Sequence, residues 1–300
     1  MKKSVLLAIP FLVLSCTTEK PANNLRSDIS TISQAAKGTV GIAIMNLEDG
    51  DTLTYNGLYH STMHSVFKFP IAMAVLNKVD SGMLSLDQQI HVSKEQMTPK
   101  TWSPMRDKYP DGNIDISIRD LLSYMVSQSD NTACEVLLQV LGGPKQVENY
   151  VHGIGAKDIA IVATETEMRA AWNVQYNNWC TPQQMMYLLA DFYKGKYLSP
   201  SSTAFLIKIM TETSTSTKRI KGLLPEGTVV ARKSGSGPTN DSGLTSATND
   251  VGVITLPNGK HLVLAAFVSD SKANDSIRDL VIAKIAKAAY DNACGNKKLE

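Results

Sequence analysis

Cysteine is scarce in this sequence, and its histidines are scattered. The 300 residues include four cysteines, with no Cys-x-x-Cys pair, and five histidines that never fall in a His-x-His or His-Glu-x-x-His pattern. Only three cysteines follow Cys16, an odd number. Such counts and spacings favour neither a disulfide framework nor a zinc site. We therefore expect no metal and no other cofactor, and a metal-dependent hydrolase is disfavoured.

The net charge of the chain is small as well. The chain carries 30 Lys and Arg against 28 Asp and Glu, and Lys2 and Lys3 account for the difference. Binding of nucleic acid depends on clustered positive charge. We therefore expect no nucleic-acid partner. We also expect the protein to be a monomer.

The first residues, MKKSVLLAIPFLVLSC, have the features of an export signal: two lysines, an apolar run and a small residue before a cysteine. The run of about ten residues is shorter than the roughly 20 that a membrane span needs. The ending Val13–Cys16 looks like a bacterial lipobox. We expect a signal peptide at 1–15, a lipid on Cys16, a tether at 16–24 and a periplasmic, lipid-anchored protein, the alternative being an ordinary cleaved signal.

Strand-like runs stand at both ends of the mature chain, with helical periodicity between them. This pattern predicts one antiparallel sheet, built from both chain ends, flanked by terminal helices and split by a helical insertion: an α+β fold. We expect one domain at 25–294, with an α/β part at 25–58 and 210–294 and a helical part at 59–209. The long stretch 157–180 is expected to be an irregular loop, and such loops are often functional. The runs are helical at 25–37, 66–210 and 277–293, and strand-like at 39–47, 52–56, 227–236, 249–256 and 260–270.

One lysine lies where lysines are rarely found. The segment HSVFKFPIAMAVLNKVD, residues 64–80, is apolar nearly all round, which is typical of a buried helix, yet it contains Lys68. Ser65 lies three residues earlier, on the same helix face. A desolvated lysine can activate a neighbouring serine as a nucleophile without histidine. Ser269 and Lys272 have the same spacing, but we interpret them as a solvated turn after a strand.

Two further motifs are unremarkable when taken singly. Ser129-Asp130-Asn131 stands between two helical patterns and suits a helix cap. Lys233-Ser234-Gly235 suits a strand that ends in a glycine-rich turn.

Taken together and in this order, Ser65-x-x-Lys68, Ser129-Asp130-Asn131 and Lys233-Ser234-Gly235 resemble the signature of serine β-lactamases and penicillin-binding proteins. The resemblance covers about 25 to 294. The segments KTWSP, RIKGLLPEGTVVARKSG and ATNDVGVITLPNG resemble the cephalosporinase-type, extended-spectrum branch of class A β-lactamases.

This resemblance implies catalytic roles. Ser65 would open the β-lactam ring and become an acyl ester, and Lys68 would take its proton, directly or through water. Ser129, helped by the charge of Lys233, would pass a proton to the departing ring nitrogen. The backbone N–H groups of Ser65 and Ser236 would form an oxyanion hole.

The resemblance also implies substrate contacts. Asn131 would hold the acylamide side chain of the drug, and Trp102 would form an aromatic wall. Ser234, next to Gly235, would bind the β-lactam carboxylate, with positive charge from Lys233 and Arg219.

Release of the acyl group requires a base that activates water, which the class A resemblance assigns to a Glu-x-x-Leu-Asn pattern. Glu165 and Met168 fit this pattern, whereas Arg169 replaces the usual asparagine, and Glu167 competes with Glu165. His64 replaces a cysteine that many relatives carry as half of a disulfide, so that pairing is absent. Whether Cys134 and Cys180 pair instead stays open.

Three functions are compatible with the motifs: a β-lactamase that uses Glu165, a D,D-peptidase of cell-wall metabolism, and a β-lactam sensor that stays acylated. The glycine-rich segment GSGPTNDSG could widen the substrate site, which favours cephalosporins beside penicillins. The resemblance thus predicts β-lactam hydrolysis and antibiotic resistance.

Overall fold

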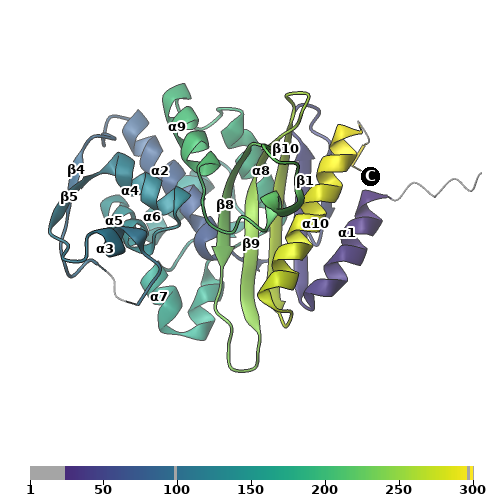
Figure 1. Cartoon of the computed structure of the whole chain (residues 1–300). Helices are drawn as coiled ribbons and strands as arrows, with labels where there is room; N and C mark the ends of the chain where they lie inside the picture. Colours follow the sequence, from purple (N-terminus) through teal and green to yellow (C-terminus); the bar gives the residue numbers. More distant parts are fainter. Residues whose placement is uncertain (1–23, 98–99, 296–297, 300) are drawn as a thin grey trace, which may run out of the picture.

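A five-stranded antiparallel sheet holds both ends of the chain together (Figure 1). The computed structural model describes residues 24–97, 100–295 and 298–299, so the expected signal peptide and Cys16 lie outside the described residues. The strand order is β2-β1-β10-β9-β8, which places the N-terminal hairpin beside the three C-terminal strands. The predicted α+β fold is therefore confirmed. The strands are β1 Thr39–Asn46, β2 Thr52–Tyr55, β8 Val230–Ser236, β9 Thr245–Thr255 and β10 His261–Ser271.

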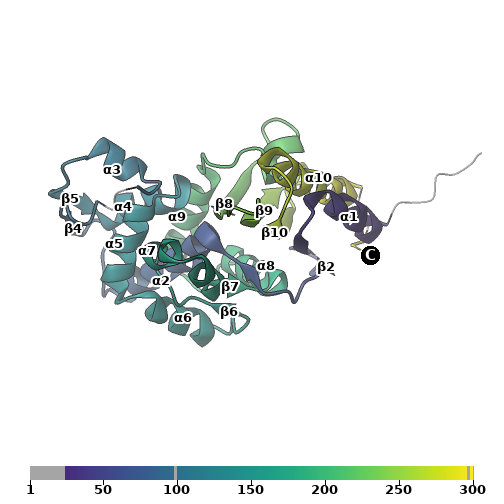
Figure 2. The ribbon, with the colours of Figure 1, turned by 90° about the horizontal axis from the view of Figure 1, so that it is seen from below.

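Helices cover both faces of this sheet (Figure 2). Helices α1, Leu25–Ser33, and α10, Asp275–Cys294, pack on one face, and α8, Pro182–Tyr193, packs on the other. Side chains alternate along a strand, so Ile42 and Ile44 of β1 face α1 and α10 while Ala43 and Met45 face the opposite core. Because both faces are covered, the strands are apolar on both sides.

Helix α2, Lys68–Asp80, lies at the centre of the helical part and contacts four other helices. Its first nine residues are all buried, as the all-round apolar pattern predicts. Pro70 is the third residue of α2, where its missing N–H has no intrahelical acceptor to lose. The other helices of this part are α3 Pro104–Lys108, α4 Ile118–Ser127, α5 Asn131–Leu141, α6 Pro144–Gly153, α7 Glu165–Ala170 and α9 Pro200–Thr211.

The stretch 157–180 is more ordered than expected. It contains β6 Ile159–Ala160, helix α7, a 3₁₀ helix at Trp172–Asn177 and β7 Trp179–Cys180. Strand β7 pairs with β6 on one side and with β3, Ser61–Thr62, on the other, and a separate hairpin joins β4 Gln89–Val92 to β5 Ile114–Ser117. The Asn178 amide fixes the stretch by accepting from Val162 N and Ala163 N and donating to Ala163 O. These elements are too short to give a periodic signal in sequence.

The second Ser-x-x-Lys match was interpreted wrongly in one respect. Strand β10 runs through Ser271, so Ser269 and Ser271 are buried in the sheet rather than part of a solvated turn. Ser269 pairs with Thr39 of β1, and only Lys272 is exposed. Within the described ranges, no helix is both long and apolar enough to cross a membrane.

Candidate functional site

A cleft of about 830 Å³ lies where the helical part meets the edge strand β8. Its walls come from the 3₁₀ turn His64–Phe67, the connection between α4 and α5, helix α7 and the end of β8. Lys68, Lys233 and Arg219 lie buried behind these walls. Eight of the residues expected from the sequence line the cleft: Ser65, Trp102, Ser129, Asn131, Glu165, Ser234, Gly235 and Ser236.

Lys68 joins three segments of the chain. Its Nζ lies 3.1 Å from Ser65 Oγ, 2.8 Å from the Ser129 carbonyl oxygen and 3.0 Å from Glu165 Oε1, and it also donates to Asn131 Oδ1. The Lys68 side chain is fully buried, and that of Glu165 is 9% exposed. A buried ammonium is expensive unless paired and hydrogen-bonded, so Glu165 and the surrounding oxygens explain how an apolar helix accommodates this lysine.

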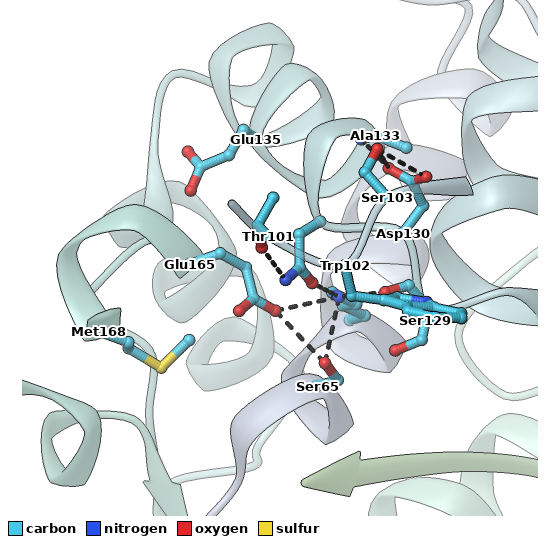
Figure 3. Close-up of polar contacts among 12 residues, drawn as sticks. Ser65, Thr101, Trp102, Ser103, Ser129, Asp130, Ala133, Glu135, Glu165 and Met168 are labelled. Atoms are coloured by element: carbon cyan, nitrogen blue, oxygen red, sulfur yellow. Dashed lines mark hydrogen bonds and ion pairs between the residues drawn. The ribbon is translucent and has the colours of Figure 1, made fainter. Parts of the chain in front are cut away.

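Glu165 and Glu167 have different environments, although they are two residues apart. Thr164 caps α7 in a reciprocal capping box, in which the Glu167 carboxylate accepts from Thr164 N at 2.8 Å. Glu165 instead points toward Ser65, with Oε1 at 3.4 Å from Ser65 Oγ (Figure 3). Met168 is buried against Asn178 at the base of the same helix. The cap thus occupies Glu167 and leaves Glu165 in the cleft.

Ser129 is held for contact with a second buried lysine. Its backbone has a φ of 58°, a left-handed conformation uncommon for a non-glycine residue. Ser129 Oγ accepts a hydrogen bond from Lys233 Nζ at 2.8 Å. Burial, followed by the nearby charge of Lys68, holds the pKa of Lys233 well below its usual range. The Lys233 ammonium is therefore a stronger acid than an exposed lysine, and it lies beside the hydroxyl expected to move a proton.

Asp130 is both a helix cap and an anchor. Its carboxylate accepts from Ala133 N, as the sequence suggested for a cap, and also from Ser103 Oγ (Figure 3). It accepts a further hydrogen bond from Met105 N. Asn131 N donates to the Trp102 carbonyl. These bonds fix the segment around Trp102 against the start of α5.

Arg219 supports the edge of β8 from behind. Its guanidinium forms an ion pair with Asp279 at 2.8 Å and donates to the carbonyl oxygens of Gly235 and Asn249 and to Ser236 Oγ. It thereby orders the strand end that faces Ser65, although Asp279 offsets part of its charge.

His64 lies directly before Ser65 in the 3₁₀ turn His64–Phe67, which is called the nucleophile turn below. Its imidazole links this turn to Gln175 and to Ser246 of β9. Its Nε2 lies 2.9 Å from Gln175 Oε1 and 3.2 Å from Ser246 Oγ. The Gln175 amide nitrogen donates to Trp172 O, so its oxygen must face His64, and His64 carries its proton on Nε2. The imidazole therefore fills the place for which the resemblance implied a missing disulfide. Cys134 and Cys180 are buried free thiols.

Four residues at the site escaped the sequence analysis. Thr101 accepts from Asn131 Nδ2 at 2.6 Å, and Thr215 contacts Ser234 Oγ at 3.1 Å. Gln175 holds His64, and Trp172 lines the cleft. Each is a polar or aromatic residue in a loop or in the 3₁₀ helix Trp172–Asn177, with no sequence spacing to distinguish it. The placement of Met168 already favoured Glu165 over Glu167, and the Thr-x-x-Glu capping box at 164–167 is a second local signal that separates the two.

Comparison with known proteins agrees with this arrangement. A family model described as "Beta-lactamase enzyme family" matches residues 24–293. This chain belongs to the beta-lactamase enzyme family. Beta-lactamase VEB-1 of Pseudomonas aeruginosa is 42% identical over 289 residues, covering 96% of this chain and 95% of VEB-1. Extended-spectrum beta-lactamase PER-1, also of P. aeruginosa, is 39% identical, covering 96% of this chain and 92% of PER-1.

Solved β-lactamases share the fold as well. The crystal structure of a beta-lactamase from Chitinophaga pinensis DSM 2588 superposes with a TM-score of 0.89 at 52% identity, covering 90% of this chain and all of that one. A class A representative from Bacteroides cellulosilyticus DSM 14838 gives a TM-score of 0.85 at 37% identity, covering 91% and 99%. The resemblance of this β-lactamase to class A is therefore confirmed.

Proposed function

We propose that this class A β-lactamase opens the β-lactam ring through an acyl ester on Ser65 and releases the acyl group with water activated by Glu165. The supporting observation is the placement of Glu165 inside the cleft, 3.4 Å from Ser65 Oγ and 3.0 Å from Lys68 Nζ. A D,D-peptidase or a sensor that stays acylated would need no carboxylate at this place. Family membership and this geometry together favour hydrolysis over both alternatives.

In the acylation step, Ser65 Oγ forms a bond to the lactam carbonyl carbon and the carbon–nitrogen bond breaks. Lys68 first passes a proton to Glu165, 3.0 Å from its Nζ, and then takes the serine proton, directly or through water. Ser129 donates a proton to the ring nitrogen and recovers one from Lys68, which takes its own proton back from Glu165. Lys233, 2.8 Å from Ser129 Oγ, stabilises the negative charge that develops there. The backbone N–H groups of Ser65 and Ser236 stabilise the carbonyl oxygen as it gains charge.

In the deacylation step, water attacks the ester carbon, Glu165 accepts its proton, and Ser65 recovers a proton as the carbon–oxygen bond breaks. Other residues of the cleft bind the substrate. Asn131 holds the acylamide group and Trp102, 60% exposed, covers the mouth. Ser234 binds the β-lactam carboxylate.

The experiment follows the acyl adduct and the drug together by intact-mass spectrometry during turnover of excess cephalosporin. We expect an adduct on Ser65 that clears as drug is consumed. Glu165→Gln should trap the adduct, because an amide cannot take a proton from water. The control is Glu167→Gln, since glutamine preserves the capping box. An adduct that persists on the unaltered protein would overturn the hydrolase proposal.

Hydrolysis of both cephalosporins and penicillins, and resistance to these drugs, are the proposed outcome. The segment 237–244 forms the tip of the β8–β9 hairpin, which projects beyond the rest of the sheet (Figure 1). Pro238 of this tip lines the cleft, so the hairpin can admit bulky cephalosporin substituents. Measurement of kcat/KM for a cephalosporin and for a penicillin tests whether the enzyme hydrolyses both drug classes.

We also propose export to the periplasm with a lipid anchor on Cys16, supported by the N-terminal sequence alone. Recovery of the protein in the membrane fraction, with the mass of a diacylglyceryl cysteine at its N-terminus, is the expected result. A soluble periplasmic product that lacks acyl chains would contradict the anchor.

A further inference from the structure

Arg169 occupies the rim of the cleft, at a position where class A resemblance leads one to expect asparagine. It lies in the last turn of α7 and is exposed, and it is one of the residues that line the cleft. Its Nη2 donates to the backbone carbonyl oxygen of Lys100. The side chain therefore bridges from α7 to the segment that precedes Trp102.

Among the described residues, the charge of Arg169 has no carboxylate partner, in contrast to the charges of Lys68 and Arg219. Lys68 is paired with Glu165 and Arg219 with Asp279. In the described parts of the chain, no carboxylate lies within 4 Å of the Arg169 guanidinium.

The acidic residues on α7 and the facing side of α5 have other partners: Glu165 is paired with Lys68. Glu167 accepts from Thr164 N, and Glu135 accepts from Thr166 N at 2.7 Å. Lys100, whose carbonyl receives the bond from Arg169, is itself exposed and adds a second positive charge to the rim.

The contacts of residues 100–102 show which part of the cleft Arg169 faces. Thr101 accepts from the Asn131 amide, and Asn131 N donates to Trp102 O. Arg169 is bonded to the same short segment through Lys100. It therefore lies on the Asn131 side of the cleft, across from Ser234 on β8, where the acylamide side chain of a substrate is expected.

We propose that Arg169 is a specificity-determining residue that binds a carboxylate on the acyl side chain of the substrate. This inference rests on the proposed function. A guanidinium has five N–H donors in a planar fork suited to a carboxylate, and the bond to Lys100 uses only one nitrogen. The contact acts in substrate binding and changes no bond-making step.

Benzylpenicillin and carbenicillin provide a matched pair of probes, because carbenicillin carries one additional carboxylate on the carbon next to the side-chain carbonyl. The measured quantity is the ratio of kcat/KM for carbenicillin to that for benzylpenicillin. Arg169→Gln should lower this ratio by about five- to tenfold, mainly through KM, as expected for one partly solvated charge-assisted contact. Arg169→Lys, which keeps the charge but not the fork, should retain part of the preference.

Two controls separate this role from a general effect. Lys284→Gln removes an exposed charge on α10, far from the cleft, and should leave the ratio unchanged. Raising the ionic strength from about 0.05 M to 0.5 M should lower the ratio for the unaltered enzyme and not for Arg169→Gln, because salt screens exposed charges.

The outcomes distinguish the two proposals. An equal loss of activity toward both penicillins in Arg169→Gln would show that Arg169 only supports α7, and would refute the carboxylate contact. Turnover of benzylpenicillin with no turnover of carbenicillin by the unaltered enzyme would refute it too. If the unaltered enzyme hydrolyses neither penicillin nor cephalosporin, the proposed function itself fails.

Discussion

Addition of one methyl group at Gly235 should separate β8 from the nucleophile turn. A Cβ built on Gly235 would lie 2.5 Å from the Met63 carbonyl oxygen, 3.1 Å from Val66 N and 3.2 Å from Val66 Cγ2. Two of these three atoms belong to the backbone beside Ser65, so no side-chain rotation can relieve the contact. In Gly235→Ala the strand or the turn must move.

The size of the effect follows from the kind of contact. Overpacking a well-packed site typically costs about 1–3 kcal/mol of the free energy of unfolding. In a protein of this size, each kcal/mol changes the melting temperature by roughly 2–4 °C, so we expect a decrease of roughly 2–12 °C. Displacement of reacting groups by about 1 Å can slow catalysis about 100-fold. We therefore expect the acylation rate to fall at least about tenfold.

The assay combines thermal unfolding, followed by circular dichroism, with stopped-flow acylation. The control is Gly153→Ala at the end of α6, where a Cβ would meet no atom within 4 Å and should be tolerated. A Gly235→Ala enzyme that keeps the melting temperature and the acylation rate of the unaltered protein would refute the reasoning, because the close approach of β8 to the turn would then have no consequence.

Two other predictions concern buried polar groups. Burial lowers the pKa of His64 in the folded protein below its usual value of about 6.5. The unfolded chain therefore binds a proton at His64 more readily than the folded protein does. The neutral, buried His64 contributes fully to the free energy of unfolding above pH 6.5, and this contribution is lost as the pH falls below 6.5. His64→Gln, which keeps a donor for Gln175, should make the melting temperature less dependent on pH below 6.5. At Asp130, each carboxylate oxygen accepts one backbone N–H, from Ala133 and from Met105. Asp130→Asn turns an amide N–H toward one of them and should lower the free energy of unfolding by about 2–3 kcal/mol, measured by urea denaturation.

Each prediction has a result that would contradict it. An unchanged pH profile in His64→Gln would mean that other groups govern acid sensitivity. Wild-type stability in Asp130→Asn would mean that the α4–α5 connection rearranges without loss of hydrogen bonds. Asp120→Asn is a matched control for the second case, since Asp120 is exposed on α4 and its carboxylate accepts only from Ser117 Oγ.

Local features of the molecule were predictable because they depend on neighbours in sequence. Thr181 caps α8 with Pro182 at its first position, and Asp130 caps α5, as their residue types indicate. The apolar run at 66–79 predicted a buried helix, and Lys68 within it predicted an unusual function for that lysine. The order of the three motifs carried the family resemblance.

Only the tertiary structure brings those three motifs together in one cleft. Lys68 reaches Glu165, and Lys233 reaches Ser129, across about a hundred residues of chain, because α7 packs against α5 and β8 packs against the 3₁₀ turn His64–Phe67. Ser269 is buried within β10, beside β1, so its match to the Ser-x-x-Lys motif does not place it in the cleft.

The sequence by itself determined which chemical groups this protein has and which helices and strands carry them, because side-chain type and hydrophobic period act over a few residues. Only the tertiary structure decided which groups meet. The structure brings Lys68 to Glu165, Lys233 to Ser129, and Arg169 to the backbone of Lys100. Such choices depend on distances between segments that are remote in sequence, and no local pattern encodes them.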